Sequence, residues 1–217
     1  MITTLFWDLG GVLLSNGWDR DARRRACERF GLDWEDFQDR HEHVVDDFET
    51  GRTDLAQYLE TTVFFEPRPF AAAEFQAFMF AQSREAPIPL ALVRRIHEQG
   101  RYRLAVINNE SLELNRYRID RFRLRECFSL FFCSCYVHLR KPDAAIYRLA
   151  LDVMQAPAGE AVLVDDRAIN VAAARRVGMH AIHYRDHNQL LASLEDLGVE
   201  VALSPGPRAD KPLSREP

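Results

Sequence analysis

ITTLFWDLGG, the stretch at residues 2–11, places one carboxylate between an apolar run and a pair of glycines. The apolar run predicts a buried strand over residues 2–8, and Gly10-Gly11 predicts an open turn after it. The carboxylate, Asp8, stands at the carboxyl end of this strand. Open α/β sheets bind their ligands at the carboxyl ends of parallel strands. Asp8 is therefore the first candidate functional residue of the chain.

Polar side chains also end or follow later apolar runs. An amide pair follows one run, a lysine stands before a proline and a helical pattern, and an acid pair ends another run. Because the carboxyl ends of parallel strands share one edge of a sheet, we expect these residues to lie near Asp8. Carboxylates, amides and a lysine together suit a metal ion and a phosphate group. The residues are Asn108, Asn109, Lys141, Asp165 and Asp166.

Strand and helix patterns alternate through the second half of the chain. We expect strands at residues 102–107, 130–135, 161–164 and 180–184, and helices at 89–99, 112–120, 142–154 and 169–177. This alternation predicts an α/β fold with a Rossmann-like parallel sheet.

Residues 18–84 follow a different pattern, with apolar and aromatic side chains at helical spacing and no alternating strand. We expect a small helical cap there, inserted after the first strand into a core formed by residues 1–17 and 85–200. Residues 204–217, rich in proline and polar residues, are predicted to be a disordered tail.

The composition of the 217-residue chain excludes several classes of protein. It is 47% hydrophobic and 28% charged, as in globular proteins. The net charge of −5 and pI near 5.8 argue against a broad nucleic-acid surface. No stretch resembles a membrane span or a signal peptide, so we expect a cytoplasmic protein. The four cysteines fit no zinc pattern, and Cys133 and Cys135 are expected on one face of a strand.

Four segments together resemble the haloacid dehalogenase-like (HAD) hydrolases. They read FWDLGGVLL, LAVINNES, RKPDAAIY and VLVDDRAIN, in that order, and the resemblance extends from about residue 2 to about residue 185. The variant DLGGV is most similar to the branch of sugar-phosphate phosphatases that includes α-glucose-1-phosphate phosphatase.

The resemblance implies a phosphatase that attacks the phosphoryl group with Asp8 and forms an aspartyl-phosphate. It implies Mg²⁺ bound by Asp8, Asp166 and the Gly10 carbonyl oxygen, with Asp165 behind these ligands or contacting the ion through water. A hard cation with oxygen ligands suits this set. The substrate is expected to be a small phosphorylated metabolite.

Further residues receive roles from the same resemblance. Lys141 would neutralise the carboxylates and bind the phosphoryl group, and it is the one lysine in the expected folded body. Asn108 and Asn109 would bind the phosphate, and Asn170 would orient Asp166 or Lys141.

The cap would select the substrate. Its candidate residues are Trp18, His41, His43, Phe48 and Arg52. The loop Glu49-Thr50-Gly51-Arg52 is expected to face the site, with Arg52 binding a second anionic group. The run Arg23-Arg24-Arg25 is expected on a solvated helix face.

Two positions depart from the family pattern. Gly10 stands where most phosphatases of the family carry an aspartate that protonates the leaving oxygen, and Asn108 replaces a serine or threonine. These departures leave open a non-catalytic protein that binds a phosphorylated ligand or a partner. A 2-haloacid dehalogenase also uses an aspartate nucleophile, but the acid pair Asp165-Asp166 argues against it.

Overall fold

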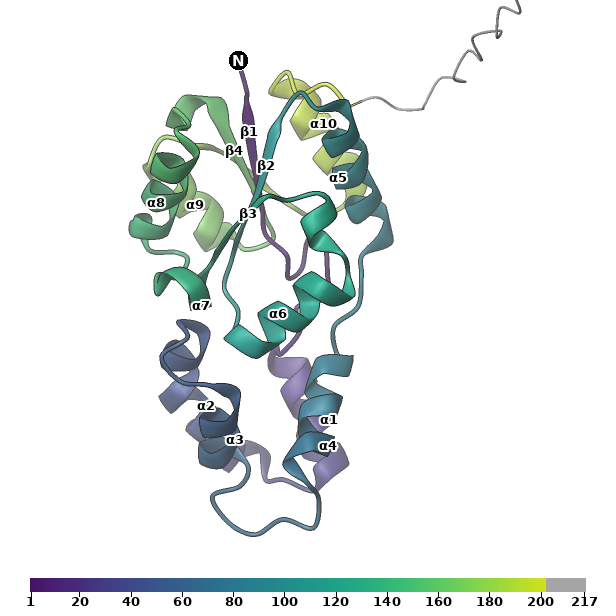
Figure 1. Cartoon of the computed structure of the whole chain (residues 1–217), viewed down its shortest axis with the longest axis vertical. Coiled ribbons are helices and arrows are strands. Elements are labelled where there is room, and N and C mark those ends of the chain that lie inside the picture. The colour runs from purple at the N-terminus through teal and green to yellow at the C-terminus, as the bar shows by residue number, and fades with distance from the viewer. Residues whose placement is uncertain (202–217) are drawn as a thin grey trace, which may run out of the picture.

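The computed structural model describes residues 1–201, and their centre is a parallel five-stranded sheet (Figure 1). The strands lie in the order β3-β2-β1-β4-β5. Their bounds are β1 Thr4–Trp7, β2 Arg103–Asn108, β3 Leu130–Cys133, β4 Ala161–Asp165 and β5 His180–His183. All four pairings are parallel, which confirms the predicted α/β fold.

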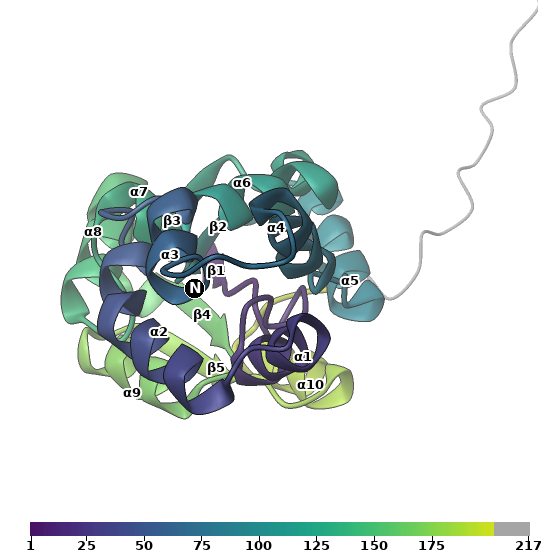
Figure 2. The same cartoon turned by 90° about the horizontal axis from the view of Figure 1, so that it is seen from below.

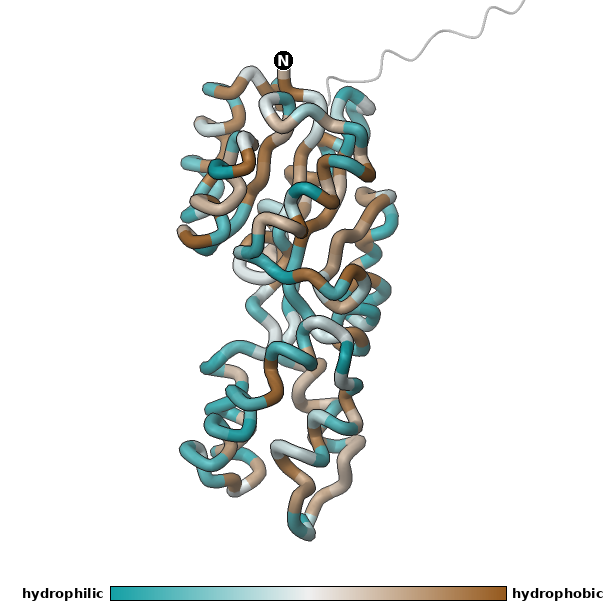
Figure 3. The backbone as a smooth tube through the Cα atoms, turned by 90° about the vertical axis from the view of Figure 1, so that its left-hand side faces the viewer, coloured by the Kyte–Doolittle hydropathy of each residue, from teal (hydrophilic) through white to brown (hydrophobic). Residues whose placement is uncertain are grey.

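Helices cover both faces of the sheet. One face packs against α5 (Pro87–Gln99) and α10 (His187–Asp196), and the other against α8 (Ala144–Met154) and α9 (Ala168–Arg176). Strand β1 sends Leu5 and Trp7 to the first face and Phe6 to the second. Burial on both faces explains why the strands read as continuous apolar runs, visible as brown segments in Figure 3.

The helices between β1 and α5 form a separate layer beyond the carboxyl edge of the sheet (Figures 1 and 2). They are α1 (Arg20–Phe30), α2 (Trp34–Glu49), α3 (Leu55–Thr62) and α4 (Ala72–Ala81). Aromatic and aliphatic side chains from all four share one buried cluster, which Leu114 of α6 (Leu112–Arg121) joins. On this arrangement we propose residues 18–84 as a helical cap on a core of residues 1–17 and 85–200.

The structure corrects one expected strand. Strand β3 ends at Cys133, and Ser134–Val137 form the short helix α7, so Cys133 and Cys135 do not share one face of a strand. At this turn the Ser134 hydroxyl donates to the Glu49 carbonyl oxygen of the cap. The remaining short helices are η1 (Leu124–Glu126) and η2 (Ala158–Glu160).

Two expectations concern other parts of the chain. The predicted tail at residues 204–217 lies outside the described residues. Within residues 1–201, no helix is long and apolar enough to cross a membrane.

Candidate active site

Three carboxylates meet at the carboxyl edge of the sheet. Asp8 directly follows β1, and its amide donates to the Val164 carbonyl oxygen of the neighbouring strand β4 at 2.9 Å. Asp165 is the last residue of β4, and Asp166 follows it. One oxygen from each carboxylate lies within 4.8 Å of the others. The parallel pairing of β1 with β4 therefore brings together acids more than 150 positions apart in sequence.

Lys141 lies buried among these acids. Its Nζ is 2.9 Å from Asp8 Oδ2 and 2.6 Å from Asp165 Oδ2. Burial alone would lower the pKa of Lys141, but the charges of Asp8 and Asp165 outweigh burial and raise it. Burial raises the pKa of Asp8 to about 7, against the opposing effect of Lys141. The pKa of Asp165 is lowered, because its contacts with Lys141 outweigh its own burial.

Asn170 orients Asp165, the partner of Lys141, whereas we expected it to act on Asp166 or Lys141. Its Nδ2 donates to both Asp165 oxygens, at 3.0 and 3.2 Å. The Arg167 amide also donates to Asp165 Oδ1, at 2.9 Å. Asp165 therefore has its oxygens engaged by protein donors, in keeping with a place behind the metal ligands.

The two asparagines after β2 occupy different positions. Asn109 lines the cavity beside Lys141, and its side chain bonds to the Lys141 main chain. Asn108 is buried, with its Nδ2 3.4 Å from Asn115 Oδ1, and it does not line the cavity.

The two glycines after Asp8 differ in what their positions allow. Gly11 has φ of +73°, and an added Cβ would lie 2.1 Å from Asp166 Oδ2, so a side chain is excluded there. Gly10 lies outside the left-handed region, and its added Cβ would meet Asn16 Oδ1 at 3.4 Å. The backbone therefore requires glycine at position 11 but tolerates a side chain at position 10.

A cavity of about 420 Å³ lies between the sheet edge and the cap. Its sheet side is lined by Asp8, Gly10, Asn109, Lys141, Asp166 and Asn170, and its cap side by Trp18, Asp19, Arg20, Arg23, His41, Val45, Phe48 and Glu49. Asn16, Glu110, Arg118 and Arg167 complete the lining. The predicted cap residues Trp18, His41 and Phe48 thus face the acid cluster.

Tyr58 organises the aromatic part of the cap lining. Trp18 Nε1 donates to the Tyr58 hydroxyl at 2.8 Å, and this hydroxyl lies 2.8 Å from His41 Nδ1. The Phe48 ring stacks on the Tyr58 ring with centroids 4.0 Å apart. Burial lowers the pKa of His41 to about 3, so the imidazole that shares the hydrogen bond with Tyr58 is neutral.

Two other predicted cap residues lie away from the cavity. The Arg52 side chain is 63% exposed and pairs with Asp47 at 3.4 Å. His43 is also exposed. Neither contributes to the cavity lining.

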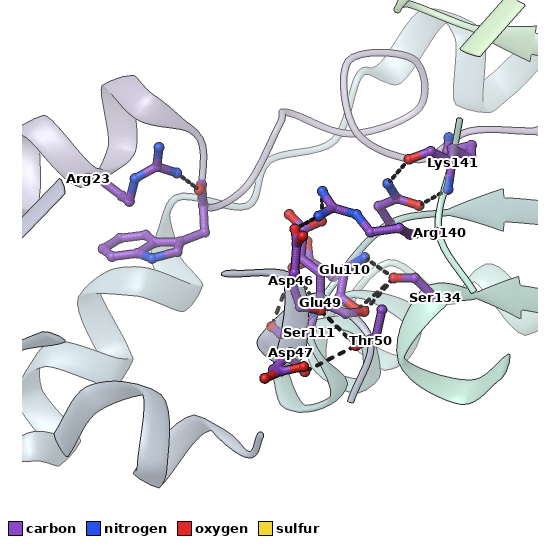
Figure 4. A network of polar contacts seen from close by, with 12 residues as sticks. Arg23, Asp46, Asp47, Glu49, Thr50, Glu110, Ser111, Ser134, Arg140 and Lys141 are labelled. Carbon is purple, nitrogen blue, oxygen red and sulfur yellow. Dashed lines mark hydrogen bonds and ion pairs between the residues drawn. The ribbon is translucent and has the colours of Figure 1, made fainter. Parts of the chain in front are cut away.

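Arg23, expected on a solvated helix face, is instead buried and lines the cavity. Its Nη1 donates to the Trp18 carbonyl oxygen at 2.7 Å (Figure 4). Its Nε donates to Gln38 at 3.2 Å. The run of three arginines concealed this position, although the apolar residues Ala22, Ala26 and Cys27 place Arg23 on the inward face of α1.

Glu110 and Arg118 form a buried ion pair that the sequence did not reveal. The two side chains lie 2.7 Å apart, and Arg118 also donates to the Ser15 carbonyl oxygen. The Ser111 amide donates to the same glutamate, at 3.0 Å. This pair connects the segment after β1 to α6 beside the cavity.

The fold and this centre define an α/β enzyme whose acids and lysine lie at the carboxyl edge of its sheet. The family model described as haloacid dehalogenase-like hydrolase matches residues 2–178. The chain belongs to the haloacid dehalogenase-like hydrolases, as its four motifs predicted.

Individual relatives cover different parts of the chain. A glyceraldehyde 3-phosphate phosphatase of Pyrococcus abyssi is 26% identical over 196 residues, covering 85% of this chain and 82% of the relative. Flavin mononucleotide hydrolase 1 of Arabidopsis thaliana is 31% identical over 84 residues, or 39% of this chain. This match spans 34% of that hydrolase. A separate match, 37% identical over 83 residues, spans 15% of the bifunctional epoxide hydrolase 2 of Sus scrofa.

Solved structures share the fold. A HAD family enzyme from Bacteroides thetaiotaomicron, in a magnesium complex, has a TM-score of 0.75 at 17% identity, covering 88% of this chain and 98% of that one.

Proposed function

We propose that this hydrolase is a Mg²⁺-dependent phosphatase of a small phosphorylated metabolite in the cytoplasm, with Asp8 as nucleophile. The observation that carries the proposal is the cluster of Asp8, Asp165 and Asp166 around Lys141 at the floor of the cavity. The phosphatase among the relatives supports the reaction type. The four free thiols suit a reducing compartment.

The donor set fits a divalent cation. Three carboxylates face one ammonium, so a doubly charged ion would balance the cluster. We assign Asp8, Asp166 and the Gly10 carbonyl oxygen as ligands, because Asp165 is already engaged by Lys141 and Asn170. Hard oxygen donors of this kind prefer Mg²⁺. When bound, the ion would screen the charge of the phosphate and hold the phosphoryl group in line.

The protein residues then perform a two-step displacement. An Asp8 carboxylate oxygen attacks phosphorus, and the bond from phosphorus to the substrate oxygen breaks, leaving an aspartyl-phosphate. Lys141 stabilises the negative charge on the phosphoryl oxygens, because its ammonium is already fixed beside Asp8. Water then attacks phosphorus, releases inorganic phosphate and regenerates the Asp8 carboxylate.

The cap side of the cavity accommodates the rest of the substrate. Trp18 and Phe48 offer apolar contact, and Arg23 offers a positive charge without an ion-pair partner within 4 Å among the described residues. A cavity of about 420 Å³ suits a small molecule. Its polar lining is compatible with a sugar phosphate, the substrate class indicated by the DLGGV motif.

A panel of phosphate esters, assayed with Mg²⁺ and with a chelator, tests this function. We expect Mg²⁺-dependent release of phosphate that Asp8→Asn abolishes. An assay with a 2-haloacid and no metal tests the alternative that the protein is a 2-haloacid dehalogenase. Binding of a phosphorylated ligand without turnover, in any of these conditions, would instead identify a non-catalytic binding protein.

A further inference from the structure

Among the described residues on the sheet side of the cavity, none is left to protonate the leaving oxygen, because Asp8 is assigned as nucleophile and Asp166 as metal ligand. Gly10 occupies the position that would carry such a group, and Lys141 is committed to Asp8 and Asp165. A leaving alkoxide gains about 10²–10⁴-fold in rate from a positioned general acid. If the proposed reaction uses poor leaving groups, the proton must come from another residue of the lining.

Most acids and bases of the lining are already engaged. Glu110 pairs with Arg118 and accepts from the Ser111 amide. Asp19 caps α1 by accepting from the Ala22 amide at 2.8 Å. His41 remains neutral because burial lowers its pKa to about 3. None of these three is set up to deliver a proton to substrate near neutral pH.

Glu49, the last residue of α2, remains as a carboxyl of the cap lining. Its main-chain oxygen accepts from the Ser134 hydroxyl of the core at 2.5 Å, and the next carbonyl oxygen, of Thr50, lies 2.7 Å from His138 Nδ1. Its Oε2 lies 2.7 Å from Arg140 Nη2, beside Lys141 in sequence, but unlike Glu110 this buried oxygen accepts no hydrogen bond. These contacts fasten the cap to the core where Glu49 reaches the cavity (Figure 4).

The surroundings of Glu49 suit proton exchange near neutrality. Burial raises its pKa to about 7, and the nearby Glu110 carboxylate acts in the same direction. Arg167, Arg23 and Lys141 oppose this shift, as does the Arg140 ion pair. Asp46, one turn earlier on α2, also pairs with Arg140, and His138 borders the Thr50 carbonyl oxygen. The side chain is 27% exposed and lines the cavity, although its Oε2 is buried.

We propose that Glu49 is the general acid and base of the reaction. It would take the role of the aspartate that most phosphatases of the family carry at the position of Gly10. The inference rests on the proposed phosphatase function. In the first step the Glu49 carboxyl gives its proton to the leaving oxygen as the bond to phosphorus breaks. In the second step the resulting carboxylate takes a proton from the water that attacks the aspartyl-phosphate, so the group returns to its starting state.

The test compares wild-type protein with Glu49→Gln, both with Mg²⁺, on p-nitrophenyl phosphate, phenyl phosphate and an alkyl phosphate. Gln keeps the shape of the side chain but has no proton to give. We expect kcat/KM for the alkyl and phenyl esters to fall at least about tenfold, while that for p-nitrophenyl phosphate changes less than about threefold. Wild-type kcat/KM for phenyl phosphate should fall above about pH 7, where the Glu49 carboxyl loses its proton. This fall should be absent in Glu49→Gln.

Asp46→Asn is the matched control, since Asp46 shares Arg140 with Glu49 but does not line the cavity. It should leave the dependence on the leaving group unchanged. Equal losses on all three esters in Glu49→Gln, or no loss on any, would overturn the proposal. A wild-type protein that hydrolyses none of the esters would instead overturn the proposed phosphatase function, and the two failures are thereby distinguished.

Discussion

Asn109 and Lys141 hold each other through two reciprocal hydrogen bonds. Asn109 Nδ2 donates to the Lys141 carbonyl oxygen, and the Lys141 amide donates to Asn109 Oδ1, each at 2.9 Å. This clamp joins the end of β2 to the loop before α8, so the Lys141 ammonium reaches Asp8 and Asp165. We therefore propose that the Asn109 side chain positions Lys141, which is a different role from the phosphate contact expected from the motif.

Lys141→Arg is expected to lower kcat/KM at least about tenfold, or about 1.4 kcal/mol of transition-state stabilisation. The compact ammonium touches two carboxylates at once, whereas a planar guanidinium needs more space in a buried site. Lys141→Met should cost more, because the carboxylates then lose their one buried cation. Steady-state kinetics on the phosphate ester that wild type hydrolyses fastest measure these losses of kcat/KM. Circular dichroism checks that the variants are folded. Wild-type rates in Lys141→Met would remove the lysine from the site.

Adding Gly10→Asp to the Glu49→Gln variant is expected to restore a general acid. Position 10 accepts a side chain without backbone strain, because its φ is not left-handed and its Cβ meets three atoms of Asn16 at 3.4 to 3.9 Å. Turnover of an alkyl phosphate should rise at least about tenfold over Glu49→Gln, with little change for p-nitrophenyl phosphate. Gly11→Ala is the matched control and should lose activity, since its Cβ would collide with Asp166. A uniform rise in Gly10→Asp for good and poor leaving groups would argue against a missing acid.

Mg²⁺ is expected to raise the melting temperature of the protein, because a ligand that binds the folded state stabilises it. At a concentration of about 100 times Kd the gain is about 2.7 kcal/mol. Asp166→Asn should abolish most of this rise, since it removes one carboxylate from the cluster. Asp186→Asn, which alters a helix cap away from the cluster, serves as control. The same rise in Asp166→Asn as in wild type would exclude this residue from the metal ligands.

Arg118→Met is expected to destabilise the protein by about 3–5 kcal/mol, because it leaves the buried Glu110 carboxylate without its partner. The double variant with Glu110→Gln should recover part of this loss, since no charge then remains unpaired. Urea denaturation of wild type, the two single variants and the double variant measures the difference. If the two losses simply add, the ion pair does not explain the destabilisation.

His41 is expected to weaken the fold in acid. Its ordinary pKa is 6.5, and burial lowers it to about 3, so between these values the unfolded chain binds the extra proton. Stability therefore falls as pH drops below about 6.5. His41→Asn should lose less stability than wild type between pH 7 and pH 4.5, by about 2–3 kcal/mol. Parallel pH profiles for the two proteins would show that His41 does not titrate in this way.

The sequence by itself determined the sheet and its acid cluster. The apolar runs before Asp8 and Asp165 define neighbouring buried strands, and the carboxyl ends of parallel strands meet at one edge. Lys141, the one lysine of the expected folded body, pointed to the same edge, where its Nζ contacts both acids. These inferences succeeded because strand periodicity and chain direction fix where a strand-end residue lies.

Only the tertiary structure decided which cap residues face the cavity. Arg52 lies outside it and Arg23 inside it, against expectation, because helix packing sets which side of the cap points inward. Glu49 reaches the cavity through contacts with Ser134 and Arg140, which lie more than 80 residues away in sequence. No local pattern encodes such contacts. They depend on how the cap and the core pack together, and this packing also buries Glu49, which raises its pKa toward neutrality.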